Sequence, residues 1–180
     1  TLDSNFHMWI WESFEFLGDN GVKITTKDHT DYWQRTFYGF RNDNGHFLYK
    51  KIKGDFVLTA ETNFHSTTLY DQCGLYARID EDNWVKTSTE YETAEYSHMG
   101  SVITNLGYSD WAKQEVHGNI NRVFYKMQRK GNDFFISTSL DGQAYKEIRV
   151  GHLHKEAAEM MVGVYACSPQ RAGFTCEITN

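Results

Sequence analysis

Proline and cysteine are scarce in this chain of 180 residues, which has one proline, Pro169, and three cysteines, Cys73, Cys167 and Cys176. So few cysteines, and an odd number of them, exclude the disulfide framework that holds small secreted domains together. A single bridge between Cys167 and Cys176 across a hairpin stays open, although free thiols are favoured. The sparse cysteines and the lack of any Asn-x-Ser/Thr acceptor site favour an intracellular protein.

Long apolar runs and an excess of basic residues are missing as well. No stretch approaches the roughly 18 apolar residues of a membrane-spanning helix, so no membrane association is predicted. The net charge is −6 and no basic stripe is present, which argues against nucleic acid as a partner. No signal-peptide pattern opens the chain. Helical periodicity is nearly absent, and the best helical segment, residues 152–159, is long enough for only a turn or two.

Aromatic residues and turn signals, in contrast, are abundant. Aromatic side chains make up 16% of the chain, which suits β structure. The turn signals are Asn20-Gly21, Asn44-Gly45, Lys53-Gly54, Gly131-Asn132 and Asp141-Gly142. Glycine beside asparagine or aspartate supplies the positive φ that tight hairpin turns need. Turns at such short spacing are typical of an all-β sandwich or barrel.

Apolar and polar residues alternate between these turns. The alternation over residues 123–128 stops at 130–133 and resumes over 134–138, which predicts a hairpin. Residues 56–64 and 160–166 alternate in the same way. With no repeat, linker or low-complexity tract, the sequence predicts one all-β domain over residues 1–180. We expect about a dozen strands in two packed antiparallel sheets, with little helix.

The most informative segment, residues 70–91, reads as two alternating strands joined by an acidic turn. One face of this pair is apolar and carries Cys73, Leu75, Ala77 and Ile79. The opposite face carries Gln72, Tyr76, Arg78, Trp84, Lys86 and Glu90. A face that mixes aromatic rings, cations and a carboxylate is unusual on a solvated sheet and predicts the floor of a cleft.

The chemistry of that face has two interpretations, which the sequence leaves equally open. Arg78 offers a planar fork of donors, Lys86 a point charge and Trp84 a stacking surface, which together suit a polar ligand or the acidic edge of a partner. Alternatively, Glu90 pairs with Lys86 or Arg78 in an intramolecular ladder of ion pairs.

A possible catalytic pair is formed by Glu90 and Glu92. Retaining glycoside hydrolysis uses two carboxyl groups about 5–5.5 Å apart, which positions i and i+2 on one strand face can approach. The strand is expected to end near Tyr91, however, and residues 93–97 read as a turn that aims Glu95 elsewhere. A solvated strand end is therefore favoured over hydrolysis.

Four further side chains are weighed as binding residues. Asp110 is suited to capping backbone N–H groups in an Asx turn, so a structural role is favoured for Asn105, Asp110 and Trp111. Trp33, flanked by polar residues, is equally compatible with the core and with the rim of a cleft.

Signals for a metal or a nucleophile are weak. One His-x-His pair, His152 and His154, has no third ligand nearby, so neither a metal nor another cofactor is predicted. No nucleophile elbow and no glycine-rich phosphate loop occurs.

Several longer patterns are similar to one protein family. They are Asp31–Thr36, Gly74–Asp80, Asn83–Lys86, Thr104–Asn105 and Tyr108–Trp111. These segments resemble the regulation of enolase protein family, a branch of the concanavalin-A-like lectin/glucanase sandwiches long catalogued as a domain of unknown function. The resemblance runs from about Trp11 to the end of the chain. It implies a jelly-roll-like sandwich with one concave sheet and places Asn105, Asp110 and Trp111 near the rim of its cleft.

By the family's name, the resemblance also implies a cytoplasmic protein that affects the glycolytic enzyme enolase, although a fold does not dictate that function. We therefore expect a non-catalytic regulatory protein that binds enolase or a small polar or sugar ligand. The alternative is a carbohydrate-binding module or retaining glycoside hydrolase that uses Glu90 and Glu92. The expected contact residues are Trp33, Gln72, Tyr76, Arg78, Trp84, Lys86, Glu90, Asn105, Asp110 and Trp111. Of these, Tyr76, Arg78 and Trp84 are of the types that dominate binding energy at interfaces.

Overall fold

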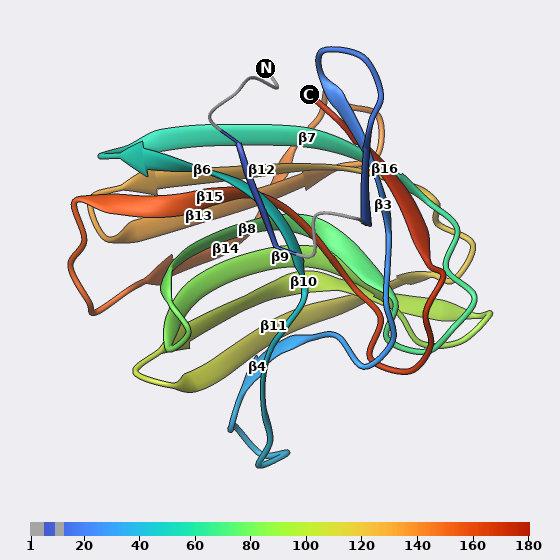
Figure 1. Ribbon diagram of the computed structural model, residues 1–180, viewed down its shortest axis with the longest axis horizontal. Coiled ribbons are helices and arrows are strands. Elements are labelled where there is room, and N and C mark those ends of the chain that lie inside the picture. The colour runs from blue at the N-terminus through green and yellow to red at the C-terminus, as the bar shows by residue number, and fades with distance from the viewer. Residues whose placement is uncertain (1–5, 10–12) are drawn as a thin grey trace.

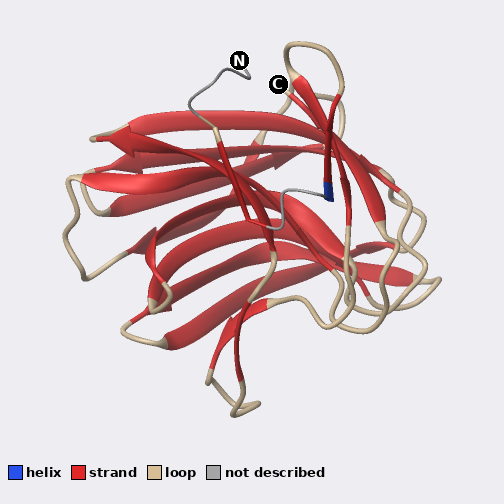
Figure 2. Ribbon diagram, viewed as in Figure 1, coloured by secondary structure: helices blue, strands red, loops and turns tan. Residues whose placement is uncertain are grey.

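Two antiparallel sheets pack face to face in the computed structural model, which describes residues 6–9 and 13–180 (Figures 1 and 2). The first sheet has the order β1 (His7–Trp9), β6 (His46–Lys53), β15 (Glu159–Cys167), β8 (Gln72–Asp80), β9 (Asn83–Tyr91), β10 (Tyr96–Asn105) and β11 (Tyr108–His117). The second has the order β14 (Lys146–His152), β13 (Asp133–Ser139), β12 (Arg122–Lys130), β7 (Phe56–Phe64), β16 (Thr175–Thr179), β3 (Gly21–Thr25) and β2 (Phe14–Phe16). The predicted all-β sandwich is confirmed.

A separate two-stranded ribbon consists of β4 (Tyr32–Gln34) and β5 (Arg41–Asp43). Figure 1 shows this β4–β5 hairpin below the first sheet, on the side away from the second sheet. The hairpin therefore lies outside the sandwich and covers part of the outer face of the first sheet.

The local turn chemistry explains the most regular part of the second sheet. β12 and β13 pair as predicted, with Lys130 opposite Asp133. Gly131 sits between them at φ 61°, in the left-handed region that glycine adopts most easily. Burial alternates along β12, whose residues Val123, Tyr125 and Met127 point inward.

Residues 152–159, the best helical candidate in the sequence, form no helix, because other groups bond the backbone of this segment. The guanidinium of Arg129 donates to the carbonyl oxygen of Ala157 at 2.5 Å. The backbone amide of Gly54 donates to the carbonyl oxygen of Ala158 at 2.9 Å. The amide of Leu153 donates to the carbonyl of Asn132 at 2.9 Å. The segment is an irregular connection between β14 and β15.

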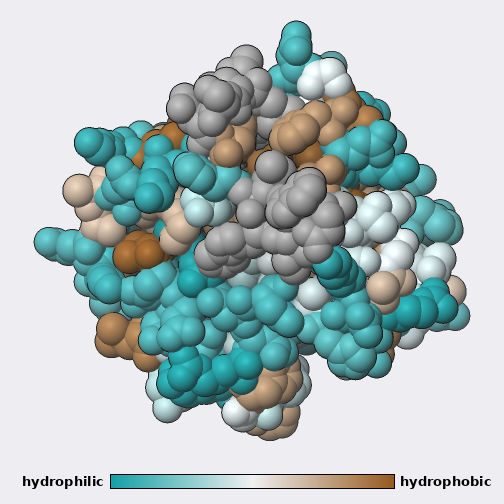
Figure 3. Space-filling view, in the orientation of Figure 1, coloured by the Kyte–Doolittle hydropathy of each residue, from teal (hydrophilic) through white to brown (hydrophobic). Residues whose placement is uncertain are grey.

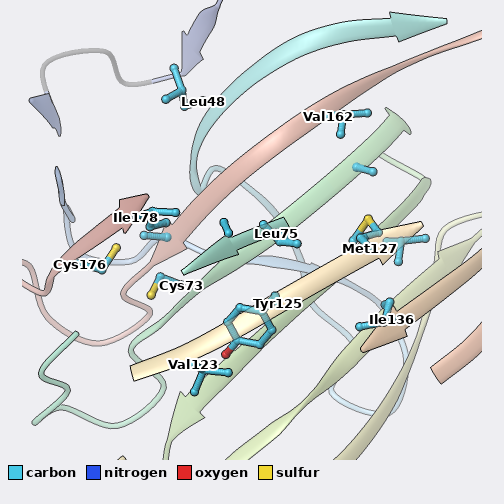
Figure 4. Packing of buried hydrophobic residues seen from close by; sticks show 14 of the residues in the cluster. Leu48, Cys73, Leu75, Val123, Tyr125, Met127, Ile136, Val162, Cys176 and Ile178 are labelled. Atoms are coloured by element: carbon cyan, nitrogen blue, oxygen red, sulfur yellow. The ribbon is translucent and has the colours of Figure 1, made fainter. Parts of the chain in front are cut away.

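The main core lies between the two sheets, where the apolar face of β8 meets β12 (Figure 4). Leu75, Val123 and Met127 are fully buried there, and burial of each such side chain contributes about 1.5–3 kcal/mol. Tyr125 keeps its hydroxyl satisfied through a 2.6 Å hydrogen bond with Thr89. A buried hydroxyl without a partner would cost free energy.

All three cysteines are free and buried. Cys73 and Cys176 belong to the main core, whereas Cys167 packs with Tyr32 and Tyr165 on the outer face of the first sheet. The bridge between Cys167 and Cys176 does not form, because β15 and β16 direct the two thiols into different layers. Burial raises the pKa of both Cys73 and Cys167 well above the ordinary thiol value.

Close strand packing requires glycine at position 163 of β15. A Cβ added there would lie 1.9 Å from the carbonyl oxygen of Leu48 on β6. We expect Gly163→Ala to lower the free energy of unfolding by about 3 kcal/mol or more, since backbone must move to admit the methyl group. The matched control is Gly131→Ala in the exposed turn, where only the left-handed φ costs about 1–2 kcal/mol. Urea unfolding measures both variants, and an equal loss in the two would contradict the packing argument.

A buried polar network joins the loops at one end of the sandwich. Ser168 donates from its hydroxyl to Asp71 at 2.8 Å and shares a 2.7 Å hydrogen bond with Thr26. The amide of Ser168 donates to the hydroxyl of Thr30 at 2.8 Å. Burial of the carboxyl group raises the pKa of Asp71 to about 6, although the bond from Ser168 opposes this. The fold therefore favours protonated Asp71.

This shift predicts a pH dependence of stability. The pKa of Asp71 is higher in the folded state than the value of 3.8 expected for the unfolded chain. Protonation of Asp71 therefore stabilises the fold most at pH values below 3.8. The contribution is lost as the pH rises toward 6, and two pKa units correspond to at most about 3 kcal/mol. We expect Asp71→Asn to flatten the stability profile between pH 4 and 6, as measured by urea unfolding. An unchanged profile would contradict this account.

Candidate functional site

The mixed face of β8 and β9 forms as the sequence predicts. In the strand register, Gln72 is opposite Glu90, Tyr76 is opposite Lys86, and Arg78 is next to Trp84. These side chains lie on the outer face of the first sheet, because Leu75 and Ala77 between them point into the core.

The segment around β4 covers much of this face. The ring of Tyr32 stacks on it, with centroids 4.5 Å from Tyr76 and 6.4 Å from Trp84. Tyr32, Tyr76 and Trp84 belong to a second cluster of buried aromatic residues outside the sandwich.

Three of the expected contact residues are therefore wrong, because they are inaccessible to a partner. Tyr76 and Trp84 each have 0% exposure. Arg78 is buried as well, and its two terminal guanidinium nitrogens donate to the carboxylate of Asp43 on β5 at 2.5 and 3.2 Å. These residues hold the β4–β5 hairpin on the sheet. Trp84 donates from its indole N–H to the carbonyl of Glu81 at 3.0 Å.

Beside this cluster, a pocket of about 300 Å³ lies between the hairpin and the sheet. Five of the expected contact residues line it: Trp33, Gln72, Lys86, Glu90 and Trp111. The other lining residues are Asp31, Tyr38, Phe40, Asn42, Tyr70, Ser88, Gly100, Ser101, Val102, Pro169 and Gln170. The pocket is thus walled by aromatic rings over a polar floor.

Lys86 is the buried cation of this floor, with 4% exposure. Its ammonium donates to the carbonyl of Tyr32 at 2.8 Å and to Oε1 of Gln72 at 3.1 Å. Its carboxylate partner is Asp31, 3.7 Å away. The ladder of Glu90 with Lys86 or Arg78 that the sequence left open is replaced by pairs with Asp31 and Asp43.

Gln72 links the cation to the carboxyl groups. Its Oε1 accepts hydrogen bonds from Lys86 and from the hydroxyl of Tyr165, at 3.1 and 2.9 Å. Its Nε2 donates to Glu90 at 2.8 Å and to the carbonyl of Tyr70 at 3.2 Å. Since two donors meet the oxygen and two acceptors meet the nitrogen, the amide orientation is fixed.

Glu90 and Glu92 form a carboxyl pair at the end of β9. Burial and a hydrogen bond with Glu92 raise the pKa of Glu90 well above its ordinary value, with a further contribution from Asp31. The charge of Lys86 opposes this shift. Glu92 also bonds Nδ1 of His98 on β10 at 2.9 Å. Burial beside a second carboxyl group therefore favours the protonated form of Glu90.

This arrangement departs from both interpretations of the pair. The expected solvated strand end is wrong, because the side chains of Glu92 and His98 are each only 13% exposed. A retaining glycoside hydrolase holds its two carboxyl groups about 5–5.5 Å apart, with the scissile bond between them. Here both carboxyl groups are engaged within the protein, Glu90 by Gln72 and Glu92 by His98.

Strand alternation separates the three residues expected from the β10–β11 region. Trp111 points into the pocket, where its ring lies edge-on to Trp33 and to His98. Asp110 lies outside it and pairs with Arg149 at 2.7 Å. Asn105 bonds the backbone of residues 152 and 154. Asn105 and Asp110 thus make contacts within the protein, although Asp110 pairs with Arg149 rather than capping a turn, and Trp111 packs against the buried aromatic cluster while it lines the pocket.

The pocket residues that the sequence did not predict come mainly from the hairpin and from the end of β9. Asp31, Tyr38 and Phe40 lie far from residues 70–91 in the sequence, and only the dense aromatic residues of this segment could have signalled them. Glu92 and His98 meet because β9 and β10 are neighbours.

The described part of the chain contains neither a metal site nor a membrane-spanning helix. Within it, no group of three or more histidine, cysteine, aspartate or glutamate side chains could hold a metal ion. No helix among the described residues is long and apolar enough to span a membrane.

Comparison with known proteins identifies the family. Residues 9–180 match the model of the family described as "Protein of unknown function (DUF1349)". The chain belongs to this family. Over 152 residues it is 32% identical to Regulation of enolase protein 1 of Saccharomyces cerevisiae, covering 84% of this chain and 75% of that protein. The resemblance found in the sequence is confirmed.

Solved structures also resemble this member of the DUF1349 family. A functionally unknown protein from Saccharomyces cerevisiae is 28% identical and superposes with a TM-score of 0.90, over 98% of this chain and 94% of that one. A GH43 protein from Bacillus licheniformis matches with a TM-score of 0.72 at 14% identity, over 99% of this chain and 36% of that one. At so low an identity, the second match shows the fold alone.

The buried Lys86 predicts a strong effect on stability. Lys86→Met keeps the apolar stem but leaves Asp31 without its cation and Gln72 without a donor. We expect a loss of about 3–5 kcal/mol in the free energy of unfolding, as when one partner of a buried pair is removed. Lys113→Met is the matched control, because Lys113 is exposed and its ammonium only stacks on Trp111. Similar urea midpoints for the two variants would contradict a structural role for Lys86.

Proposed function

We propose that this protein is a non-catalytic, cytoplasmic regulatory protein that acts on enolase by binding it at the mouth of the pocket. The relationship to Regulation of enolase protein 1 supports the regulatory role through that protein's name. The carrying observation is the set of exposed aromatic side chains at the pocket, because exposed apolar groups that cluster at a cleft are typical of binding sites.

These aromatic side chains belong to the tip of the β4–β5 hairpin. Phe37 is 93% exposed, and Tyr38 and Phe40 are exposed as well. Tyr38 contacts both phenylalanine rings, with centroids 5.2 and 5.9 Å away. Figure 3 shows a tan and white projection at the lower end of the molecule, where Figure 1 places this hairpin. Such a tip provides the aromatic anchors that dominate binding energy at interfaces.

The floor of the pocket supports binding rather than catalysis. Lys86 and Gln72 use their hydrogen bonds within the protein, and Glu92 is hydrogen-bonded to His98. These contacts therefore stabilise the floor of the pocket in one conformation.

A second candidate is the binding of a carbohydrate, which one observation favours. Trp33 and Trp111 line the pocket together with neutral polar side chains such as Asn42 and Gln170. Aromatic faces beside polar groups suit a hydroxylated ring. A glycan array separates this candidate from the first, because a pure protein-binding surface gives no hits.

The experiment that tests the regulatory proposal is calorimetric titration of purified enolase into this protein. We expect a complex with the wild-type chain and a loss of at least about tenfold in affinity for Phe37→Ala combined with Tyr38→Ala, since truncated hot-spot residues cost about 2 kcal/mol or more. The matched control is Leu140→Ala, an exposed apolar residue in the connection after β13. It should bind as the wild type does.

An absence of heat with wild-type protein, at concentrations where a micromolar complex would be seen, removes direct binding of enolase. Equal affinities for the hairpin variant and Leu140→Ala would instead place the interface elsewhere on the molecule.

A further inference from the structure

The charge distribution around the pocket indicates which group of a partner enters it. The acidic residues of the lining are Asp31 and Glu90, and Glu92 lies close to Glu90. Lys86 is the one lysine or arginine among the lining residues, and its charge is already offset by Asp31 at 3.7 Å. A further positive group is therefore favoured in the pocket and a negative one is disfavoured.

The walls suit a cation with an apolar stem. Trp33, Tyr38, Phe40 and Trp111 line the pocket, and aromatic faces attract ammonium groups. One cation already shows this preference within the protein, because the ammonium of Lys113 lies 4.0 Å from the ring centroid of Trp111. A lysine side chain would lay its methylene groups along the rings and bring its ammonium to the carboxyl groups.

The mouth of the pocket favours a protein as the source of that lysine. The hairpin tip extends beyond the pocket lining with Phe37, which a free amine inside the pocket would leave uncovered. Arg35 and Phe37 hold positive φ angles of 60° and 59°. Such strained backbone is uncommon outside functional sites, since each residue costs about 1–3 kcal/mol. The net charge of −6 would also steer a basic surface toward this chain.

We propose that the pocket receives a lysine side chain of a protein partner, and that its ammonium pairs with the carboxyl group of Glu90. The inference rests on the protein-binding function proposed above and names the chemistry of the group recognised. Binding breaks the O–H bond of Glu90, the proton passes to solvent, and the carboxylate pairs with the ammonium.

The raised pKa of Glu90 makes this exchange dependent on pH. The titratable and charged groups around Glu90 and Glu92 are Asp31, Tyr70, Lys86, His98 and Cys167. The bound complex holds fewer protons than the free protein, so raising the pH favours binding. If one proton is released, the affinity rises by up to about tenfold per pH unit until Glu90 ionises in the free protein.

The test uses the wild-type chain and a pair of small probes, Nα-acetyl-lysine methylamide and its neutral Nε-acetylated form. The indole N–H signals of Trp33 and Trp111 report binding by NMR. We expect the cationic probe to shift the Trp111 signal with a Kd in the millimolar range, about −4 kcal/mol, and with an affinity that rises with pH. The neutral probe should bind at least about tenfold more weakly.

Glu90→Gln provides the matched test of the mechanism. It keeps an acceptor for Gln72 but cannot ionise, so affinity for the cationic probe should fall about tenfold and lose its pH dependence. Glu159→Gln, an exposed carboxylate at the start of β15, should behave like the wild type. Equal binding of the two probes, an affinity that falls with pH, or no response below about 10 mM overturns the inference.

The outcomes also separate this inference from the function on which it rests. If the hairpin variant loses enolase while neither probe binds, protein binding stands and lysine recognition falls. If the probes bind and enolase does not, the pocket chemistry stands and the choice of enolase falls. A carbohydrate that shifts the same indole signals while the cationic probe does not would overturn lysine recognition in favour of the second candidate.

Discussion

The rest of the site depends on the hydrogen bonds that the ammonium of Lys86 donates. It joins the backbone of β4, through the carbonyl of Tyr32, to the floor of the first sheet, through Gln72. A buried ammonium is costly unless it is hydrogen-bonded and paired, and here Asp31 supplies the opposite charge from the same segment. The hairpin and the sheet therefore satisfy one another's polar groups, and the pocket exists because the hairpin is held in place.

The same contact determines the state of the carboxyl groups. Lys86 and Tyr165 both donate to the oxygen of Gln72, so the amide can offer only N–H groups to Glu90. The charge of Lys86 is paired with Asp31, whereas Glu90 is buried beside Glu92 without a paired cation of its own among the described residues. The protonated form of Glu90 is therefore favoured, because two adjacent carboxylates with little solvent would repel each other. The chemistry at the end of β9 is thus set by a lysine four residues earlier.

Strand alternation was sufficient to predict most of the fold and one face of the site. It placed Leu75 in the core and Lys86 and Glu90 together on the opposite face, since successive strand residues point to opposite sides. It could not show that Tyr32 would cover Tyr76 and Trp84, because that contact joins segments more than 40 residues apart. A mixed polar and aromatic face has the same sequence pattern whether solvent or another segment lies on it.

The different environments of Trp84 and Trp111 have one cause. Both are tryptophans on the outer face of the same sheet, and the sequence around them does not distinguish their exposure. The β4–β5 hairpin covers the strands near β8 and leaves the end of β9 with β10 and β11 open to the pocket. Position relative to the hairpin, rather than residue type, therefore decides which aromatic ring stabilises the fold and which is available to a partner. The exposed, strained tip lies on the open side, where stability alone gives no reason to keep a phenylalanine.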